Sequence, residues 1–310
     1  MNKKKLIVLV GPTASGKSDL GIKLAKKING EIISADSRQI YRDMDIGTGK
    51  VGRDAILPSL KPKALSLKPD YYSSGIRHHL LDIADPKKQF SASDFKKLGE
   101  RAIEDIIAKN KIPVVVGGTG FYIDILLGRM QTAEVKPNKK LRAKLEKQSA
   151  EQLFKRLSVL DSEYSGIIDR YNKRRLIRAL EIILTTGKPM PKLIPQNQYH
   201  ILWLGLNPKD LQKKIKTRLN SRLRGGMIKE VKKLRRQGLS WKRLGDFGLE
   251  YRWISRYVRG LIPQNKMREN LYRDIIKYSK RQMTWFKKNK EINWINGIKN
   301  AEALARRFVD

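Results

Sequence analysis

Short apolar runs alternate along the chain with longer segments in which apolar residues recur every three or four positions. The runs at 6–10, 31–35 and 112–116 have the length and composition of buried parallel strands. Residues 93–109 place their apolar side chains on one face of a helix. This alternation predicts an α/β fold built on a doubly wound parallel sheet, in which ligands bind at the carboxyl ends of strands.

The pattern changes in the second part of the chain. Strand signals disappear at 130–195, where basic amphipathic helices such as 172–186 take over, and they return at 201–204 and near 292–295. We therefore predict a catalytic core formed by 1–129 and 196–310, with an all-helical domain inserted at 130–195. The Pro-, Lys- and Ser-rich segment 52–74 is expected to be a surface excursion.

The first strand run leads into a sequence that fits G-x-x-x-x-G-K-[ST] at every fixed position. It consists of Gly11, Pro12, Thr13, Ala14, Ser15, Gly16, Lys17 and Ser18. Between a strand and a helix, the backbone N–H groups of such a loop and the helix N-terminus bind phosphate groups. The sequence therefore predicts a P-loop that grips a phosphorylated ligand, with Ser18 as a ligand of Mg²⁺.

Charge narrows the choice of partner. The chain has 67 Lys and Arg against 30 Asp and Glu, a formal net charge of +37. Such an excess favours a polyanion as partner, nucleic acid before a membrane surface. The absence of Cys excludes disulfides and thiolate metal sites, and no apolar run approaches the length of a membrane span. We expect a cytoplasmic protein that does not contact membranes.

The P-loop alone leaves several reactions open. Hydrolytic NTPases hold Mg²⁺ with an Asp at the end of a later strand, but the run at 112–116 ends in Gly117, Gly118 and Thr119. A small-molecule kinase remains open because Asp36, at the end of the second run, could act as a base for an acceptor hydroxyl. A kinase, however, does not need a basic helical insertion.

Several motifs follow one another in an order that resembles the tRNA dimethylallyltransferases, also called tRNA isopentenyltransferases. After GPTASGKS come ISADSRQIYRDMDIGTGK at 33–50, HHLLDIADP at 78–86, FSASDF at 90–95, VGGTGFY at 116–122, RLIRALE at 175–181 and KRQMTWF at 280–286. The resemblance extends from about residue 5 to residue 290. It implies transfer of a dimethylallyl group from dimethylallyl diphosphate to the exocyclic amine of the adenosine 3′ of the anticodon, with release of diphosphate.

The chemistry assigns roles to individual residues. Lys17 and a Mg²⁺ ion at Ser18 would neutralise the leaving diphosphate, with Arg218 and Arg222 as further clamps. Asp36 would accept the proton of the amine, as the resemblance also implies, and Thr119 would lie beside the reacting atoms. The resemblance further implies contacts with the anticodon stem-loop of tRNA by Asp36, Ser37, Arg38, Gln39, Thr119, Arg142, Arg174, Arg175, Leu176, Ile177 and Arg178.

Structural alternatives accompany these assignments. Asp36 could cap a helix, Thr119 could only shape a glycine turn, and the arginines could lie on solvated faces or in ion pairs. His78 and His79 are expected to be structural. Two other functions stay open: a prenyltransferase for free adenine nucleotides, and an RNA-associated P-loop kinase or NTPase. We expect the protein to act as a monomer.

Overall fold

The chain divides into two compact units. The computed structural model describes residues 3–55, 70–130, 135–191 and 198–310. Unit 1 comprises Met1–Leu127 and Asn197–Asp310, and unit 2 comprises Gly128–Gln196. The predicted end of the inserted domain at residue 195, and residues 56–69 of the predicted excursion, lie outside the described residues.

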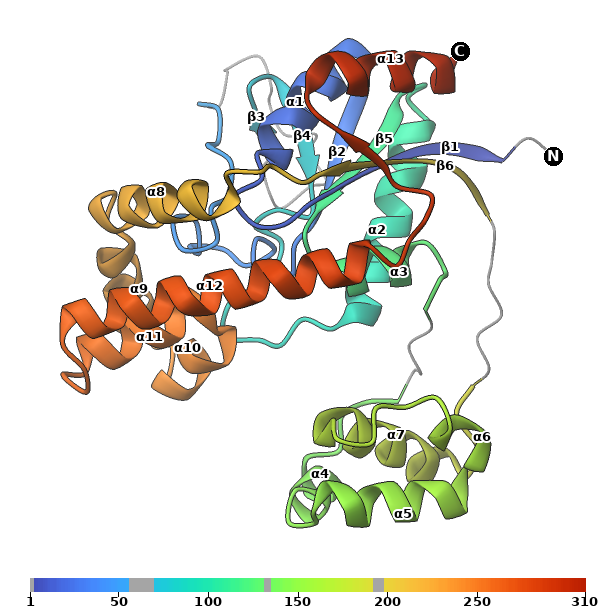
Figure 1. Cartoon of the computed structure of the whole chain (residues 1–310), viewed down its shortest axis with the longest axis vertical. Coiled ribbons are helices and arrows are strands. Elements are labelled where there is room, and N and C mark those ends of the chain that lie inside the picture. Colours follow the sequence, from blue (N-terminus) through green and yellow to red (C-terminus); the bar gives the residue numbers. More distant parts are fainter. Residues whose placement is uncertain (1–2, 56–69, 131–134, 192–197) are drawn as a thin grey trace. The chain divides into compact units, whose positions relative to one another are not determined.

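Unit 1 is built on a seven-stranded sheet with the order β3-β4-β2-β5-β1-β6-β7 (Figure 1). The strands are β1 (Lys4–Val10), β2 (Gly30–Ala35), β3 (Tyr71–Ser73), β4 (Ile76–His79), β5 (Ile112–Gly117), β6 (Tyr199–Leu206) and β7 (Asn293–Ile295). All neighbouring pairs are parallel except β3 with β4. The predicted α/β class and parallel sheet are confirmed, whereas the sequence did not indicate the short antiparallel hairpin of β3 and β4.

Helices cover both faces of this sheet. On one face, α1 (Lys17–Lys27) and α13 (Ile298–Val309) pack against Ile7 and Leu9 of β1. On the other face, α2 (Ala92–Ile107) and α3 (Gly120–Leu126) pack against Leu6, Val8 and Val10. The buried strands thus carry apolar residues on both faces, as expected for a parallel sheet in the middle of three layers.

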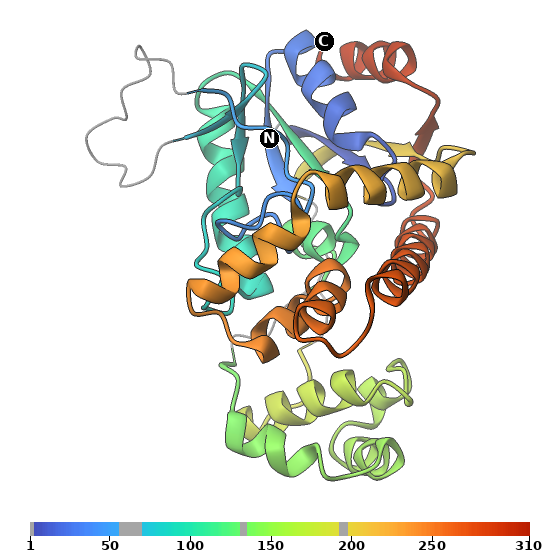
Figure 2. The same ribbon diagram turned by 90° about the vertical axis from the view of Figure 1, so that its left-hand side faces the viewer.

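A second hydrophobic core in unit 1 is formed mainly by helices. The helices are α8 (Leu211–Arg224), α9 (Met227–Arg236), α10 (Trp241–Phe247), α11 (Leu249–Val258) and α12 (Gln264–Phe286), and Figure 2 shows them gathered together. They bury Ile40, Tyr41 and Met44, which belong to the segment that follows β2. The carboxyl end of β2 is thereby held against this helical layer.

Unit 2 is all-helical. Its helices are α4 (Lys139–Leu145), α5 (Ala150–Leu160), α6 (Ser162–Ser165) and α7 (Lys173–Thr186). Their core contains Leu145, Leu153, Leu157 and Leu180, and α7 ends at Gly187, which adopts the left-handed conformation with φ of 67°. In the part of the chain that the structure describes, every helix is too short or too polar to span a bilayer.

Candidate active site

The P-loop connects β1 to α1 in the expected strand–loop–helix arrangement. Gly16 lies in the left-handed region with φ of 88° just before α1 begins, so a residue with a side chain would be strained there. The Ser15 N–H donates to the Pro12 carbonyl at 3.2 Å, which turns the loop back on itself. The loop can therefore present several N–H groups together with the N-terminus of α1 to an anion.

Three cationic side chains surround this loop. The Lys17 Nζ donates to the Pro12 carbonyl at 3.2 Å. Burial and the nearby Arg218 and Arg222 guanidinium groups together lower the pKa of Lys17 to about 8, although Asp36 opposes the shift. Burial and the proximity of Arg222 likewise lower the pKa of Arg218 to about 10. Burial and mutual repulsion of these cations outweigh the compensation from the nearby Asp36 and Glu250 carboxylates, which favours a bound anion with several charges.

Both arginines extend from α8 and bond the loop that follows β2. The Arg218 Nη2 donates to the Gly49 carbonyl at 3.2 Å, and the Arg222 Nη1 donates to the Gly47 carbonyl at 3.3 Å. A Cβ atom at Gly49 would lie 1.6 Å from the Arg222 Nη2, so only glycine allows this approach. The Arg222 Nη1 is also 3.3 Å from Glu250 Oε1, and burial raises the pKa of Glu250. Nothing in the residue pattern singled out Glu250.

Asp36 stands at the carboxyl end of β2. Its Oδ1 accepts hydrogen bonds from the Arg38 N–H at 2.8 Å and the Gln39 N–H at 3.4 Å. In the described structure no group donates to Asp36 Oδ2. One carboxylate oxygen thus fixes the side chain by capping the following turn, and the other can accept a proton.

Thr119 links the ends of β2 and β5. Its N–H donates to the Ala35 carbonyl at 3.3 Å, and its Oγ1 accepts from the Ser37 N–H at 3.2 Å. The Tyr278 side chain on α12 lies beside Thr119, and burial raises the pKa of Tyr278. The structure therefore bonds Thr119 to the residues on either side of Asp36. Only the KRQMTWF motif, two residues further along, marked this part of α12 in the sequence.

The loop after β2 is shaped by a buried carboxylate that sequence reasoning missed. Glu230 accepts from the N–H groups of Asp45 at 2.8 Å, Ile46 at 2.7 Å and Gly47 at 3.0 Å. It also accepts from the Tyr251 hydroxyl at 2.8 Å. Three consecutive N–H groups on one carboxylate fix the loop that receives the arginines of α8.

Arg38 and Gln39, two of the predicted RNA-contacting residues after β2, form hydrogen bonds with other parts of unit 1. The Gln39 Nε2 donates to the carbonyls of Thr48 and Gly49, both at 3.3 Å, and the Arg38 Nη2 donates to the Asp246 carbonyl at 3.3 Å. Both side chains remain partly exposed. Their contact with RNA stays a prediction, as does that of Ser37.

The predicted RNA-contacting residues of unit 2 fall into separate groups. Arg142 Nε and Nη2 donate to Glu181 Oε1 and Oε2 at 2.8 and 2.7 Å, and Arg178 Nη1 is 2.5 Å from Glu181 Oε2. Glu181 is completely buried. Although burial raises its pKa, these hydrogen bonds lower the pKa of Glu181 to about 2. Arg142 and Arg178 therefore hold unit 2 together, with their side chains only about one-third exposed.

The remaining members of this set differ in exposure. The side chains of Leu176 and Ile177 are 0% and 4% exposed and lie in the core of unit 2. A side-chain contact of these two residues with RNA is not compatible with this packing. Arg174 and Arg175 are exposed at the start of α7, so they are the members of the set that can meet a phosphate directly.

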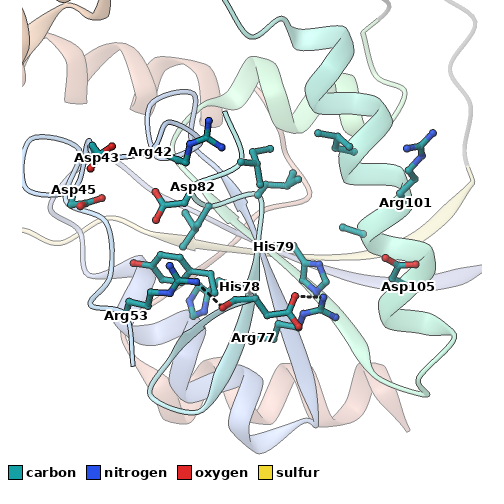
Figure 3. Close-up of a pocket in the computed structure, with 17 residues that line it drawn as sticks. Arg42, Asp43, Asp45, Arg53, Arg77, His78, His79, Asp82, Arg101 and Asp105 are labelled. Carbon is teal, nitrogen blue, oxygen red and sulfur yellow. Dashed lines mark hydrogen bonds and ion pairs between the residues drawn. The ribbon is translucent and has the colours of Figure 1, made fainter. Parts of the chain in front are cut away.

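A separate cavity of about 550 Å³ lies beside β4 and α2 (Figure 3). His79 Nε2 at its wall is 2.7 Å from Glu31 Oε2, and Lys111 donates to Glu31 Oε1 at 2.9 Å. These bonds lower the pKa of the buried Glu31 to about 2, although burial opposes the shift. Burial lowers the pKa of His78, whose Nδ1 is 2.9 Å from the Ile76 carbonyl. Both histidines thus have structural partners, and the described residues that line the cavity include none of the P-loop.

A metal ion at the P-loop would have few protein ligands. Among the described residues, no group of three or more His, Cys, Asp or Glu side chains could hold a metal. Ser18 is half-buried in the first turn of α1 and offers one hydroxyl oxygen. This suits Mg²⁺, which commonly takes its other ligands from phosphate oxygens and water.

Comparisons with known proteins agree on one family. The model of the IPP transferase family matches residues 39–289, and that of the isopentenyl transferases matches residues 4–59. The chain is 36% identical to tRNA dimethylallyltransferase 1 of Geotalea uraniireducens, over 97% of each chain. It is 37% identical to the tRNA dimethylallyltransferase of Acetivibrio thermocellus, over 94% of this chain and 91% of the other.

Solved structures support the same relationship. The full-length tRNA isopentenylpyrophosphate transferase of Bacillus halodurans aligns with a TM-score of 0.68 and 32% identity, covering 99% of this chain and 96% of the other. A eukaryotic dimethylallyltransferase acting on tRNA aligns with a TM-score of 0.79 and 25% identity, covering 99% and 79%. The likeness therefore includes both sequence and fold over nearly the whole chain.

Proposed function

This chain belongs to the family of tRNA dimethylallyltransferases, and from that premise we propose how its residues divide the work of the reaction. The protein is a transferase that moves a dimethylallyl group from a diphosphate donor to tRNA. The observation that carries the assignment of residues is the cluster of buried cations with lowered pKa values at the P-loop, close to Asp36. A diphosphate donor and an amine acceptor can meet at such a site.

The donor's diphosphate binds the loop from Gly11 to Ser18. Backbone N–H groups and Lys17 face its oxygens, while Arg218 and Arg222 approach from α8. The low pKa of Lys17 supports this role, because a site that disfavours its own positive charges gains most from an incoming anion. Catalysis follows if these groups hold the diphosphate more tightly as it leaves and its negative charge grows.

Mg²⁺ is proposed as the ion that accompanies the donor. Ser18 would hold it through its hydroxyl oxygen, with the diphosphate supplying further oxygens. When bound, such an ion adds positive charge opposite the leaving group. The lack of a three-ligand protein site among the described residues supports an ion that arrives with the donor.

The acceptor is the exocyclic amine of an adenosine. Its nitrogen forms a bond to the first carbon of the dimethylallyl group, and the bond between that carbon and the diphosphate oxygen breaks. The diphosphate leaves with the electron pair, and the proton released from nitrogen passes to Asp36 Oδ2. Anchoring of Oδ1 by Arg38 and Gln39 supports this assignment, because it keeps the second oxygen in one position. Thr119 orients the amine or the bridging oxygen of the donor.

The RNA partner is the anticodon stem-loop, from which the adenosine must be extruded to reach the site. Arg174 and Arg175 bind its phosphates, supported by their exposure at the start of α7. The net charge of +37 favours encounter with any RNA. That one copy of the chain suffices for tRNA stays a prediction.

The test is to incubate the protein with dimethylallyl diphosphate labelled in the prenyl group, together with tRNA, AMP or ATP. We expect label on tRNA only, at the adenosine 3′ of the anticodon. Label on AMP without label on tRNA would contradict the function and favour a nucleotide prenyltransferase. Hydrolysis of ATP stimulated by RNA, with no prenyl transfer, would favour an RNA-associated NTPase.

A further inference from the structure

One side chain on α12 connects the two loops that hold donor and acceptor. The Gln282 Oε1 accepts from the Thr13 N–H in the P-loop, and its Nε2 donates to the Gly118 carbonyl beside Thr119, both at 2.8 Å. Gln282 is only 6% exposed. Its partners lie 269 and 164 positions away in the sequence, so the amide joins parts of the chain that no local structure brings together.

The chemistry of the two partners fixes the orientation of this amide. An N–H group requires an acceptor and a carbonyl requires a donor, so only one orientation of Gln282 satisfies both. A Cβ atom at Gly118 would lie 2.3 Å from the Gln282 Nε2. A residue with a side chain at position 118 would therefore displace the amide, which explains why glycine is needed where the chain leaves β5.

Gln282 belongs to a stripe of α12 that faces the loop after β5. Tyr278, Gln282 and Trp285 follow one another at four- and three-residue spacing on one side of the helix. Tyr278 lies beside Thr119, and the Trp285 Nε1 donates to Asp124 Oδ2 at 2.8 Å. All three side chains thus hold the segment 118–124. Of the three, Gln282 also bonds the P-loop.

Resting on the proposed function, we propose that Gln282 is a positioning residue that sets the separation between the diphosphate in the P-loop and the acceptor beside Thr119. Transfer requires the amine nitrogen and the donor carbon to approach along one line, at close to van der Waals distance. The P-loop determines where the carbon lies, and the loop containing Thr119 determines where the nitrogen lies. Because Gln282 bonds the backbone of both, it ties these positions together without touching the reacting atoms.

Two substitutions separate this role from simple packing. Gln282→Leu has a similar size but loses both hydrogen bonds. We expect its single-turnover rate of prenyl transfer to fall about 10- to 100-fold, while its Kd for tRNA changes less than about twofold. In Gln282→Glu the ionised carboxylate still accepts from Thr13 but cannot donate to Gly118. Because Lys17, Arg218 and Arg222 beside the P-loop favour the ionised carboxylate, we expect the rate of this variant to stay below that of wild type between pH 6 and 8.

Trp253→Phe provides the matched control. It removes the hydrogen bond of 2.8 Å from Trp253 Nε1 on α11 to Asp274 Oδ2 on α12. Asp274 lies on the same helix as Gln282 but bonds neither of the two loops. We expect a lower Tm for this variant and a single-turnover rate within about twofold of wild type. An unchanged single-turnover rate in Gln282→Leu would overturn the positioning role. The role would also be overturned if Trp253→Phe lost as much rate as Gln282→Leu at the same loss of Tm. Absence of prenyl transfer by the wild-type protein would instead refute the proposed function.

Discussion

Binding of a diphosphate ligand should be accompanied by proton uptake at mildly alkaline pH. In the free protein, burial and the nearby Arg218 and Arg222 lower the pKa of Lys17 from 10.5 to about 8. A diphosphate beside the ammonium group favours its charged form and raises the pKa again. Between these two pKa values the complex therefore carries more protons than the free protein, and affinity decreases as pH rises.

The size of the effect follows from the pKa of about 8. Free Lys17 is about nine-tenths protonated at pH 7, about half at pH 8 and about one-tenth at pH 9. If the bound Lys17 stays charged throughout, uptake is about 0.1 proton per ligand at pH 7, about 0.5 at pH 8 and about 0.9 at pH 9. The ligand loses protons of its own in this range, so the effect of Lys17 appears in the comparison with Lys17→Arg. Relative to that variant, the Kd of the wild type should rise about tenfold from pH 7 to pH 9.

Titration calorimetry can measure this uptake directly. Inorganic diphosphate is injected into the protein at pH 7, 8 and 9, each in two buffers with different heats of ionisation. Lys17→Arg is the control, because a guanidinium group stays charged over this range. Arg218, whose pKa is lowered to about 10, contributes little below pH 9 and is present in both proteins. Equal proton uptake by wild type and Lys17→Arg at pH 8 would refute the reasoning.

Three further predictions concern the acceptor side and unit 2. Asp36→Asn should lower the single-turnover rate about 100- to 1,000-fold with tRNA affinity within about twofold; a normal rate would rule out Asp36 as the base. Arg175→Ala should weaken tRNA binding and reduce the slope of log K against log salt concentration by about 0.7 to 1, and an unchanged slope in filter-binding assays would exclude a phosphate contact. Glu181→Gln should destabilise unit 2 by about 2–3 kcal/mol in denaturant unfolding of the full chain at pH 7. Because the pKa of Glu181 is lowered from 4.5 to about 2, that difference should be fully present above pH 4.5 and disappear as pH falls toward 2.

Much of the site was accessible from the sequence because its parts are local. A P-loop needs eight consecutive residues between a strand and a helix, and its function depends on backbone groups that those residues position themselves. The strand ends that carry Asp36 and Thr119 could be predicted in the same way, because apolar runs identify buried strands and parallel strands end at one edge of a sheet.

Side-chain roles within unit 2 were not accessible in this way. The sequence marks Arg174, Arg175 and Arg178 equally as basic residues near one end of a helix. The packing of α4 against α7 brings Arg142 to the buried Glu181, which Arg178 reaches from the same helix three residues away, whereas Arg174 and Arg175 stay exposed. Helical periodicity identifies which face is apolar, but it does not say which neighbour a long charged side chain reaches.

The sequence by itself determined the α/β class, the phosphate-binding loop, the carboxylate at the end of β2 and the strongly basic surface, because each depends on residues that are adjacent or regularly spaced. The tertiary structure alone decided that Glu250 pairs with Arg222, that Glu230 shapes the loop after β2, and that Gln282 joins Thr13 to Gly118. These contacts join residues up to 269 positions apart. Such partners meet only after the helices have packed, so no local pattern of residue types encodes them.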